Sequence, residues 1–254
     1  MIRRRVRVAV TLVSFVVASA GFAPALDFSI GAHGGLSIPN IRGNQTNIFT
    51  QGFGSREGPF FGIFVESRFS SHFSLVAELN YTSQGGQRNG LQPITMELPP
   101  GLEVPPGTIL YGNFHNETIL DYIEIPVMAR VTFGNRLRFF LNAGPYVGFL
   151  VRALAVTRGS SLIYLDEAGT EPVISSPVSF DADTDVKDSL KTTNFGLAGG
   201  GGLMYPLGPG DLILEAHFQL GLLTIQKDVE TSGKSQTGAV VISLGYSFSL
   251  RRSK

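Results

Sequence analysis

Apolar and polar side chains alternate along the run from Leu212 to Leu222, LILEAHFQLGL. Because successive side chains of a β-strand point to opposite faces, this period of two predicts a strand with one apolar and one polar face. The run is as long as the roughly 9–11 residues with which a tilted strand crosses a bilayer. The same pattern also fits a strand of a soluble sandwich. The rest of the chain must therefore decide which medium the apolar face meets.

Seven further segments alternate in the same way and predict seven more strands. They are residues 26–38, 60–69, 73–81, 119–133, 137–151, 193–205 and 240–250. Two prolines, Pro126 and Pro145, fall inside these segments and would each remove a ladder hydrogen bond, so we expect β-bulges there. The glycine run from Gly199 to Gly202 is expected to make room for large neighbours inside a narrow barrel.

The connections between these segments alternate in length. Long loops are expected at about residues 39–58, 85–117 and 153–189, and short turns at 70–72, 134–135 and 206–211. The second loop contains Pro93, Pro99-Pro100 and Pro105-Pro106, which argue against regular ladder pairing across most of it. An even number of antiparallel strands with every long loop at one end is typical of outer-membrane barrels. The predicted fold is all-β: an eight-stranded antiparallel up-and-down transmembrane β-barrel with both termini in the periplasm.

The N-terminus predicts export. Four arginines within the first seven residues precede an uncharged apolar run over 8–20, and Ala23-Pro24-Ala25 offers a small-x-small cleavage site. We therefore expect residues 1–25 to be a signal peptide and 26–254 to form the barrel domain. No later segment reaches the 18 or so consecutive apolar residues of a membrane-spanning helix.

Composition excludes several kinds of chemistry. The chain of 254 residues has no cysteine, which removes disulfides, thiolate metal sites and a cysteine nucleophile. Its formal charge is zero and no basic run lies beyond the first residues, so no nucleic-acid partner is expected. Its four histidines show no paired metal-ligand spacing, and no glycine-rich phosphate loop is present, so neither a metal nor a cofactor is predicted.

Most charged side chains within the predicted strands lie on the polar faces, and none lies in the centre of an apolar face. In a membrane barrel the apolar face meets lipid, and the polar face must hold complementary charge inside the barrel. The residues expected to form this structural lumen network are Glu66, Arg68, Glu78, Glu124, Arg130, Arg138, Glu215 and His217.

Aromatic side chains collect at the ends of the apolar faces near the short turns. An aromatic girdle is therefore expected on the periplasmic side, made of Phe28, Phe69, Phe73, Phe133, Phe139, Tyr205 and Phe248. The last strand, from Ser243 to Leu250, is similar to the C-terminal signal that the outer-membrane assembly machinery reads. Outer-membrane lipid and this machinery are the expected partners, and the long loops are expected to recognise a surface or periplasmic protein.

Five blocks of sequence resemble one family. They are SLVAELNYTSQGG (74–86), YIEIPVMARVTF (122–133), FFLNAGPYVGFL (139–150), NFGLAGGGGLMY (194–205) and VVISLGYSF (240–248). Their order and spacing resemble the PorT-type outer-membrane β-barrel family across nearly all of the segment from residue 26 onward. The resemblance implies an eight-stranded barrel in the outer membrane and no particular activity.

The predicted function is that of a structural or surface-interaction barrel with a closed polar lumen and no catalytic activity. Two alternative functions compete with it. One is a soluble periplasmic barrel that binds a small apolar ligand as lipocalins do, which requires the apolar faces to point inward. The other is a barrel hydrolase, because Glu215 and His217 share a face two residues apart. No nucleophile-elbow motif supplies a serine for that pair, so no catalysis is expected.

Overall fold

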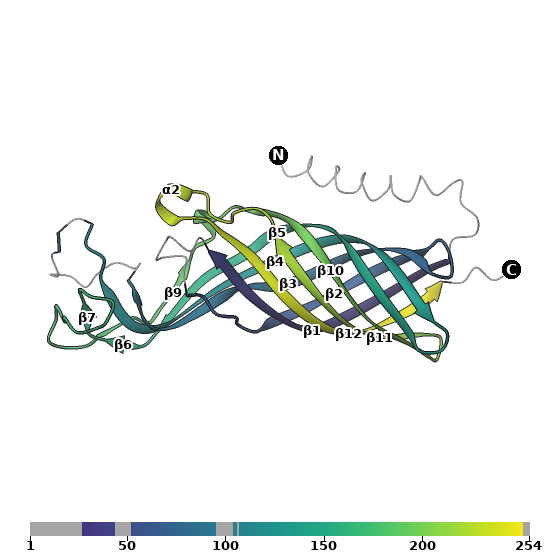
Figure 1. Cartoon of the computed structure of the whole chain (residues 1–254), viewed down its shortest axis with the longest axis horizontal. Helices are drawn as coiled ribbons and strands as arrows, with labels where there is room; N and C mark the ends of the chain where they lie inside the picture. Colours follow the sequence, from purple (N-terminus) through teal and green to yellow (C-terminus); the bar gives the residue numbers. More distant parts are fainter. Residues whose placement is uncertain (1–26, 44–51, 95–103, 106, 251–254) are drawn as a thin grey trace.

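The computed structural model describes residues 27–43, 52–94, 104–105 and 107–250. The predicted signal peptide over 1–25, the tips of the first two predicted loops and residues 251–254 lie outside the described residues. Eight long strands form the wall of a barrel (Figure 1). They are β1 (Asp27–Gly43), β2 (Gly58–Arg68), β3 (Phe73–Pro93), β4 (Tyr111–Gly134), β5 (Arg138–Arg158), β10 (Thr193–Leu207), β11 (Gly210–Gly221) and β12 (Ser235–Leu250).

Each barrel strand pairs antiparallel with its neighbours, and the sheet closes on itself. The order runs β4, β3, β2, β1, β12, β11, β10, β5, and β5 pairs back onto β4. The first and last strands seal the seam, with Phe28 opposite Leu250. The predicted eight-stranded antiparallel up-and-down architecture is confirmed. The start of β1, the end of β12 and the tight turns lie at one end of the barrel (Figure 1).

The outer surface of the barrel is an apolar belt. The seven residues of the predicted girdle are 38% to 59% exposed and ring the end that carries the tight turns. Toward the other end lies a second set of outward aromatics, in which Phe61 stacks on Tyr81 at 4.9 Å and which also includes Phe149 and Phe195. Two aromatic rims around an apolar band are what a bilayer requires of a barrel surface.

Because the apolar faces point outward, the soluble alternative is wrong. A barrel that binds an apolar ligand inside would bury Leu214, Leu244 and Phe218, yet these side chains are 47%, 56% and 66% exposed. An exposed apolar surface of this extent in water would be an aggregation site. Among the described residues, no helix has the length and apolar character needed to span a membrane.

The expected bulges at Pro126 and Pro145 are not found. Around Pro126 the β3–β4 ladder lapses between Ala77↔Val127 and Asn80↔Glu124 and resumes in the same register. The β4–β5 ladder also keeps its register across Pro145, because each proline removes only its own hydrogen bond. The register shift lies instead between Asp121 and Tyr122, at the outer end of the belt.

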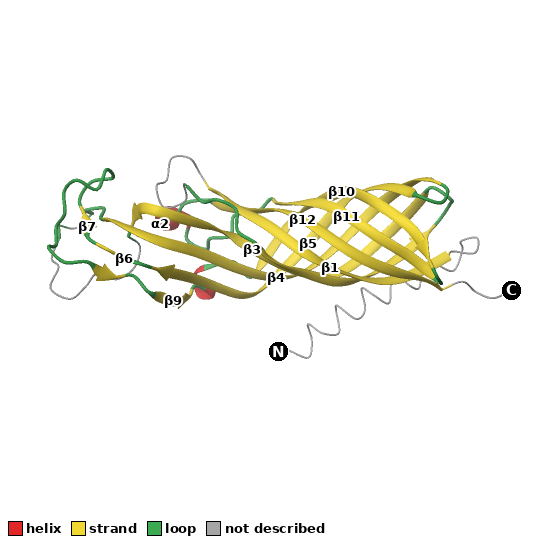
Figure 2. Ribbon diagram, turned by 90° about the horizontal axis from the view of Figure 1, so that it is seen from below, coloured by secondary structure: helices red, strands yellow, loops and turns green. Residues whose placement is uncertain are grey.

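Paired strands extend into the predicted loops at 85–117 and 153–189, which corrects the sequence-based boundaries. β3, β4 and β5 continue well past the belt and stay paired, down to Pro93 opposite Tyr111. Pro93 ends its strand, so it interrupts no ladder. Figure 2 shows this sheet projecting from the barrel. The first predicted loop is also shorter than expected, since β1 runs to Gly43 and β2 begins at Gly58.

Short elements complete the projecting sheet, which we call the outer extension (residues 84–93, 104–105, 107–120 and 154–185). They are β6 (Ser160–Ser161), β7 (Ile163–Tyr164), β8 (Val178–Ser179) and β9 (Ala182–Asp185). The extension has an apolar core of its own, built on Leu110, Phe114, Ile163 and Phe180, with Phe114 stacked on Phe180 at 4.8 Å. It is therefore a folded part of the protein.

Candidate functional site

A buried arginine occupies the lower half of the lumen, toward the tight turns. Arg130 of β4 is 2% exposed, and its guanidinium lies 3.5 Å from a Glu215 carboxylate oxygen and 4.0 Å from one of Glu66. The guanidinium also lies over the ring of Phe140, 4.2 Å from the centroid. Ser74 donates a hydrogen bond to Glu66 at 2.6 Å. One cation thus compensates two carboxylates from strands on opposite sides of the lumen.

A second group of polar side chains surrounds Glu215. Asn142 donates to its carboxylate at 2.8 Å, and Nδ1 of His217 lies 3.4 Å from the same oxygen. Across the lumen, Asn80 donates to Glu78 at 2.8 Å, and its amide oxygen lies 2.8 Å from a ring nitrogen of His33. Every one of these side chains is almost fully buried, which a charged group tolerates only when it is paired or hydrogen-bonded.

Glu124 lies higher in the lumen and is fully buried. It accepts hydrogen bonds from Thr82 at 3.1 Å, from Gln84 at 2.5 Å and from Gln219 at 2.7 Å. Three donors from β3 and β11 thus converge on one carboxylate of β4. This arrangement links β3 and β4 to β11 across the lumen.

The lumen is not uniformly polar, which corrects the expectation of a polar interior. Phe64, Val76, Phe140, Met204 and Ile213 form one buried apolar cluster, and Met128, Tyr146 and Ala198 form another. An eight-stranded barrel is just wide enough for its side chains to fill it, and apolar groups fill the space between the charges.

Inward glycines make this filling possible. A Cβ on Gly202 would lie 2.7 Å from the ring of Phe140, and one on Gly196 would lie 2.5 Å from the ring of Tyr146. Such contacts are too short for any side chain larger than hydrogen. The glycine run of β10 therefore faces large rings from β5, and the lumen is closed by side-chain packing.

The structure places all eight predicted lumen residues on the inner face, at different depths. Glu66, Glu78, Glu124, Arg130, Glu215 and His217 are buried. Arg68 and Arg138 lie nearer the rim, with side chains 27% and 19% exposed. Arg68 approaches Glu66 at 3.5 Å, and Arg138 binds Asp211. The purely structural role of this network stays a prediction.

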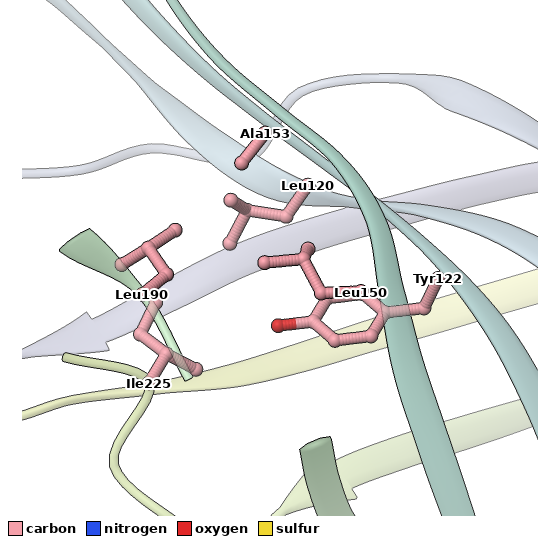
Figure 3. Close-up of a cluster of buried hydrophobic side chains, with 6 residues drawn as sticks. All are labelled: Leu120, Tyr122, Leu150, Ala153, Leu190 and Ile225. Atoms are coloured by element: carbon pink, nitrogen blue, oxygen red, sulfur yellow. The ribbon is translucent and has the colours of Figure 1, made fainter. Parts of the chain in front are cut away.

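An apolar cap closes the outer end of the lumen (Figure 3). Leu190, next to the short helix η2 (Lys187–Ser189), and Ile225, before the short helix α2 (Val229–Ser232), pack on Leu120, Tyr122 and Leu150. Backbone hydrogen bonds join the two cap segments, with Lys191 N–H donating to Ile225 at 2.7 Å. The cap closes the lumen at the end away from the tight turns.

The positions of the described histidine and acidic side chains give little support to a catalytic or metal site. Within the described residues, no hydrogen bond joins His217 to a serine hydroxyl. No three histidine or acidic side chains of the described chain gather in a way that could hold a metal ion. His217 instead packs its ring edge-on against Phe60 at 5.6 Å, deep inside the barrel.

The outer extension carries a second group of polar residues, on the face that continues the barrel exterior. We call this group the outer wall: Asn89, Asn113, His115, Glu117, Arg158 and Asp183. Arg158 and Asp183 form an ion pair at 2.6 Å, and Arg56 binds Glu117 at 2.6 Å. His115 contacts Asn89 through their polar atoms. The opposite face of the same sheet holds Phe114 and its apolar core.

Sequence reasoning missed both the outer wall and the apolar lumen side chains. The wall lies in segments that their prolines and glycines marked as loop, and Tyr111–Ile119 shows no period-two alternation that would have indicated a strand. The apolar lumen residues sit at polar-face positions, where a glycine on the neighbouring strand signals a large partner.

A closed ring of eight antiparallel strands, an apolar exterior with two aromatic rims and a filled interior define a transmembrane β-barrel. The family model described as outer membrane protein beta-barrel domain matches residues 18–226. The chain therefore belongs to this family, whose members are outer-membrane barrels.

Three solved structures illustrate the likeness of fold. Neisserial surface protein A is 14% identical with a TM-score of 0.38, and 87% of this chain covers 96% of it. Ail of Yersinia pestis is 12% identical with a TM-score of 0.39, and 88% of this chain covers all of it. The N-terminal barrel domain of Pseudomonas aeruginosa OprF is 14% identical with a TM-score of 0.37, at 89% and 100% coverage. Such distant likenesses carry no argument about function. No curated protein matches the chain.

Proposed function

We propose that this outer-membrane barrel is a non-enzymatic surface-interaction protein of the PorT type, whose outer extension is the recognition element. The observation that carries the proposal is the contrast between the lumen of the barrel and its outer extension. The lumen is filled and capped, whereas the extension has its own apolar core and presents a folded polar surface beyond the membrane. A protein that only anchored itself would not need such an extension.

The proposal includes an orientation. The end with the tight turns and both termini faces the periplasm, and the extension faces the outer medium. Residues 1–25 are removed as a signal peptide, and β12 is the strand that the assembly machinery reads. Sequencing of the protein purified from outer membranes is expected to begin at Leu26. Protease added to intact cells is expected to cut within 84–120 or 154–185 and to spare the turn at 134–137.

A closed lumen predicts the absence of large conductance. Because Phe140, Tyr146 and Arg130 fill the interior and Leu190 and Ile225 cap it, the refolded protein should give no stable single-channel steps in planar bilayers. An outer-membrane porin reconstituted in the same way serves as the positive control. Stable, large steps from the full chain would contradict the closed lumen.

Removing the extension tests its role in recognition. A variant that lacks residues 86–118 and 155–184, with short turns in their place, keeps every lumen and cap contact described above. We expect it to insert and to keep the gel mobility of a folded barrel, but cells that display it should bind less to serum- or mucin-coated surfaces than cells with the full chain. Equal binding by the two on every coat would reject the extension as the recognition element.

The hydrolase alternative has a direct assay. The purified barrel is expected to release no product from lipid esters or from peptides, because His217 is buried and bonded to no serine among the described residues. Hydrolysis that disappears in a folded His217→Ala variant would overturn the non-enzymatic proposal.

A further inference from the structure

The outer wall lies on the same face of its strands as the lipid-facing surface of the barrel. On β3 the outward positions run from Phe73 through Tyr81 to Asn89, and on β4 the outward residues Ile123 and Ile125 lead to His115. Asn89 lies about 26 Å further along the strand than Tyr81, at about 3.3 Å per residue. The wall is therefore the part of this face that stands above the apolar belt, beyond the phosphate headgroups, which extend only about 5–8 Å from the hydrocarbon core.

The charges of the wall are already paired. Arg158 binds Asp183, and Glu117 binds Arg56, each at 2.6 Å. No guanidinium of this set is left to bind a phosphate, and no carboxylate of it is left to attract a basic segment. Together with Arg56, the wall is thus neutral, and a charged partner gains little from it.

The remaining chemistry suits a ligand that both donates and accepts hydrogen bonds. Asn89 and Asn113 present exposed amides, and the side chain of His115 is 33% exposed. The ion pairs hold their side chains in place, which lowers the entropy lost when a ligand binds. Hydroxyl groups both donate and accept, so a surface of amides, imidazole and fixed ion pairs matches a saccharide.

We propose that the outer wall binds the saccharide headgroup of a glycolipid in the surrounding outer leaflet. The position of the wall, on the same face as the lipid-facing belt, favours a membrane glycolipid over a free glycan. This site is independent of the recognition that we propose for the rest of the extension. Its role is to hold the projecting sheet against the sugar layer of the membrane.

The full chain in nanodiscs tests the proposal with three lipid compositions. They are phospholipid alone, phospholipid with lipid A that carries no core sugars, and phospholipid with rough lipopolysaccharide that carries the core oligosaccharide. The unfolding temperature is the temperature at which samples, heated in steps before the gel, lose the mobility of the folded barrel. We expect the core sugars to raise it beyond the lipid A value. Equal values for lipid A and for rough lipopolysaccharide would overturn the proposal, because acyl chains and phosphates would then explain all binding.

Substitutions in the wall, with one control outside it, test whether the wall causes the sugar-dependent rise in unfolding temperature. The double substitution Asn113→Leu with His115→Leu should abolish the sugar-dependent shift, and Thr184→Leu, exposed on the opposite face of the same sheet, should keep it. If the double variant fails to refold, the single exposed substitution Asn113→Ala should reduce the shift. A shift that persists in the folded wall variants would reject the site.

Two further experiments distinguish this proposal from a free-glycan site and from the proposed function. Soluble core oligosaccharide added to phospholipid discs should give no shift, and a full shift there would replace the glycolipid by a free glycan. The same wall variants should retain cell adhesion to coated surfaces, because they leave the rest of the extension unchanged. If the proposed function alone fails, deletion of the extension leaves adhesion unchanged while the full chain still shows the sugar-dependent shift. Loss of adhesion in the folded wall variants would overturn the independence of the glycolipid site from recognition.

Discussion

Replacing Arg130 by alanine is expected to destabilise the barrel by about 3–5 kcal/mol, which is the usual cost of removing one partner of a buried ion pair. The substitution leaves Glu215 buried with only neutral donors and His217 nearby, and leaves Glu66 with the partly exposed Arg68 as its remaining cation. It also removes the group that lies over Phe140 and opens space in a packed interior. Because the chain has no tryptophan, urea unfolding of the refolded protein is best followed by circular dichroism and gel mobility.

Two variants separate lost charge compensation from lost packing. Arg68→Ala also removes a cation near Glu66, but the Arg68 side chain is 27% exposed, so a loss of about 0–1 kcal/mol is expected. Adding Glu215→Gln to Arg130→Ala should restore part of the stability, because one uncompensated carboxylate disappears. No recovery in the double variant would mean that packing of the guanidinium, and not its charge, carries the effect.

The sequence predicts the barrel well because one physical requirement repeats eight times. A wall between lipid and a filled lumen forces alternation on every strand, so Leu214 and Phe218 point outward wherever Glu215 and His217 point inward. The same alternation fixes which residues can form the lumen network. It does not fix their partners, because Arg130 contacts Glu66 and Glu215 across strands that are distant in sequence.

The sequence fails where that requirement ends. Beyond the belt both faces of a strand can be polar, so the outer parts of β3, β4 and β5 resemble loop, and prolines strengthen that impression. Pro93 causes no disruption because it stands at the end of β3. In the lumen, pairs such as Gly202 and Phe140 depend on register between strands, which alternation within one strand cannot reveal.

Placing an arginine in the middle of the apolar belt is the second change with a large expected effect. Leu244 of β12 is 56% exposed and lies opposite the outward Leu214 of β11 and opposite Gly34 of β1. If this surface meets lipid, Leu244→Arg should cost about 2–4 kcal/mol, as cationic side chains do at the bilayer midplane. If the surface met water, the same substitution would be nearly neutral or stabilising. Urea titration in lipid vesicles, with membrane fractionation of cells, distinguishes the two outcomes.

A matched substitution above the belt sharpens this test. Val156 of β5 points to the same outer face but lies within the outer extension, opposite Glu117. Because the cost of a charge falls to about 0–1 kcal/mol near the membrane interface, Val156→Arg should be tolerated. A large penalty at Leu244 with a small one at Val156 places the outer boundary of the bilayer between the belt and the outer wall. Similar penalties at both positions would mean that the extension is immersed in lipid as well, and the proposed contact of the wall with sugars would then fail together with the boundary.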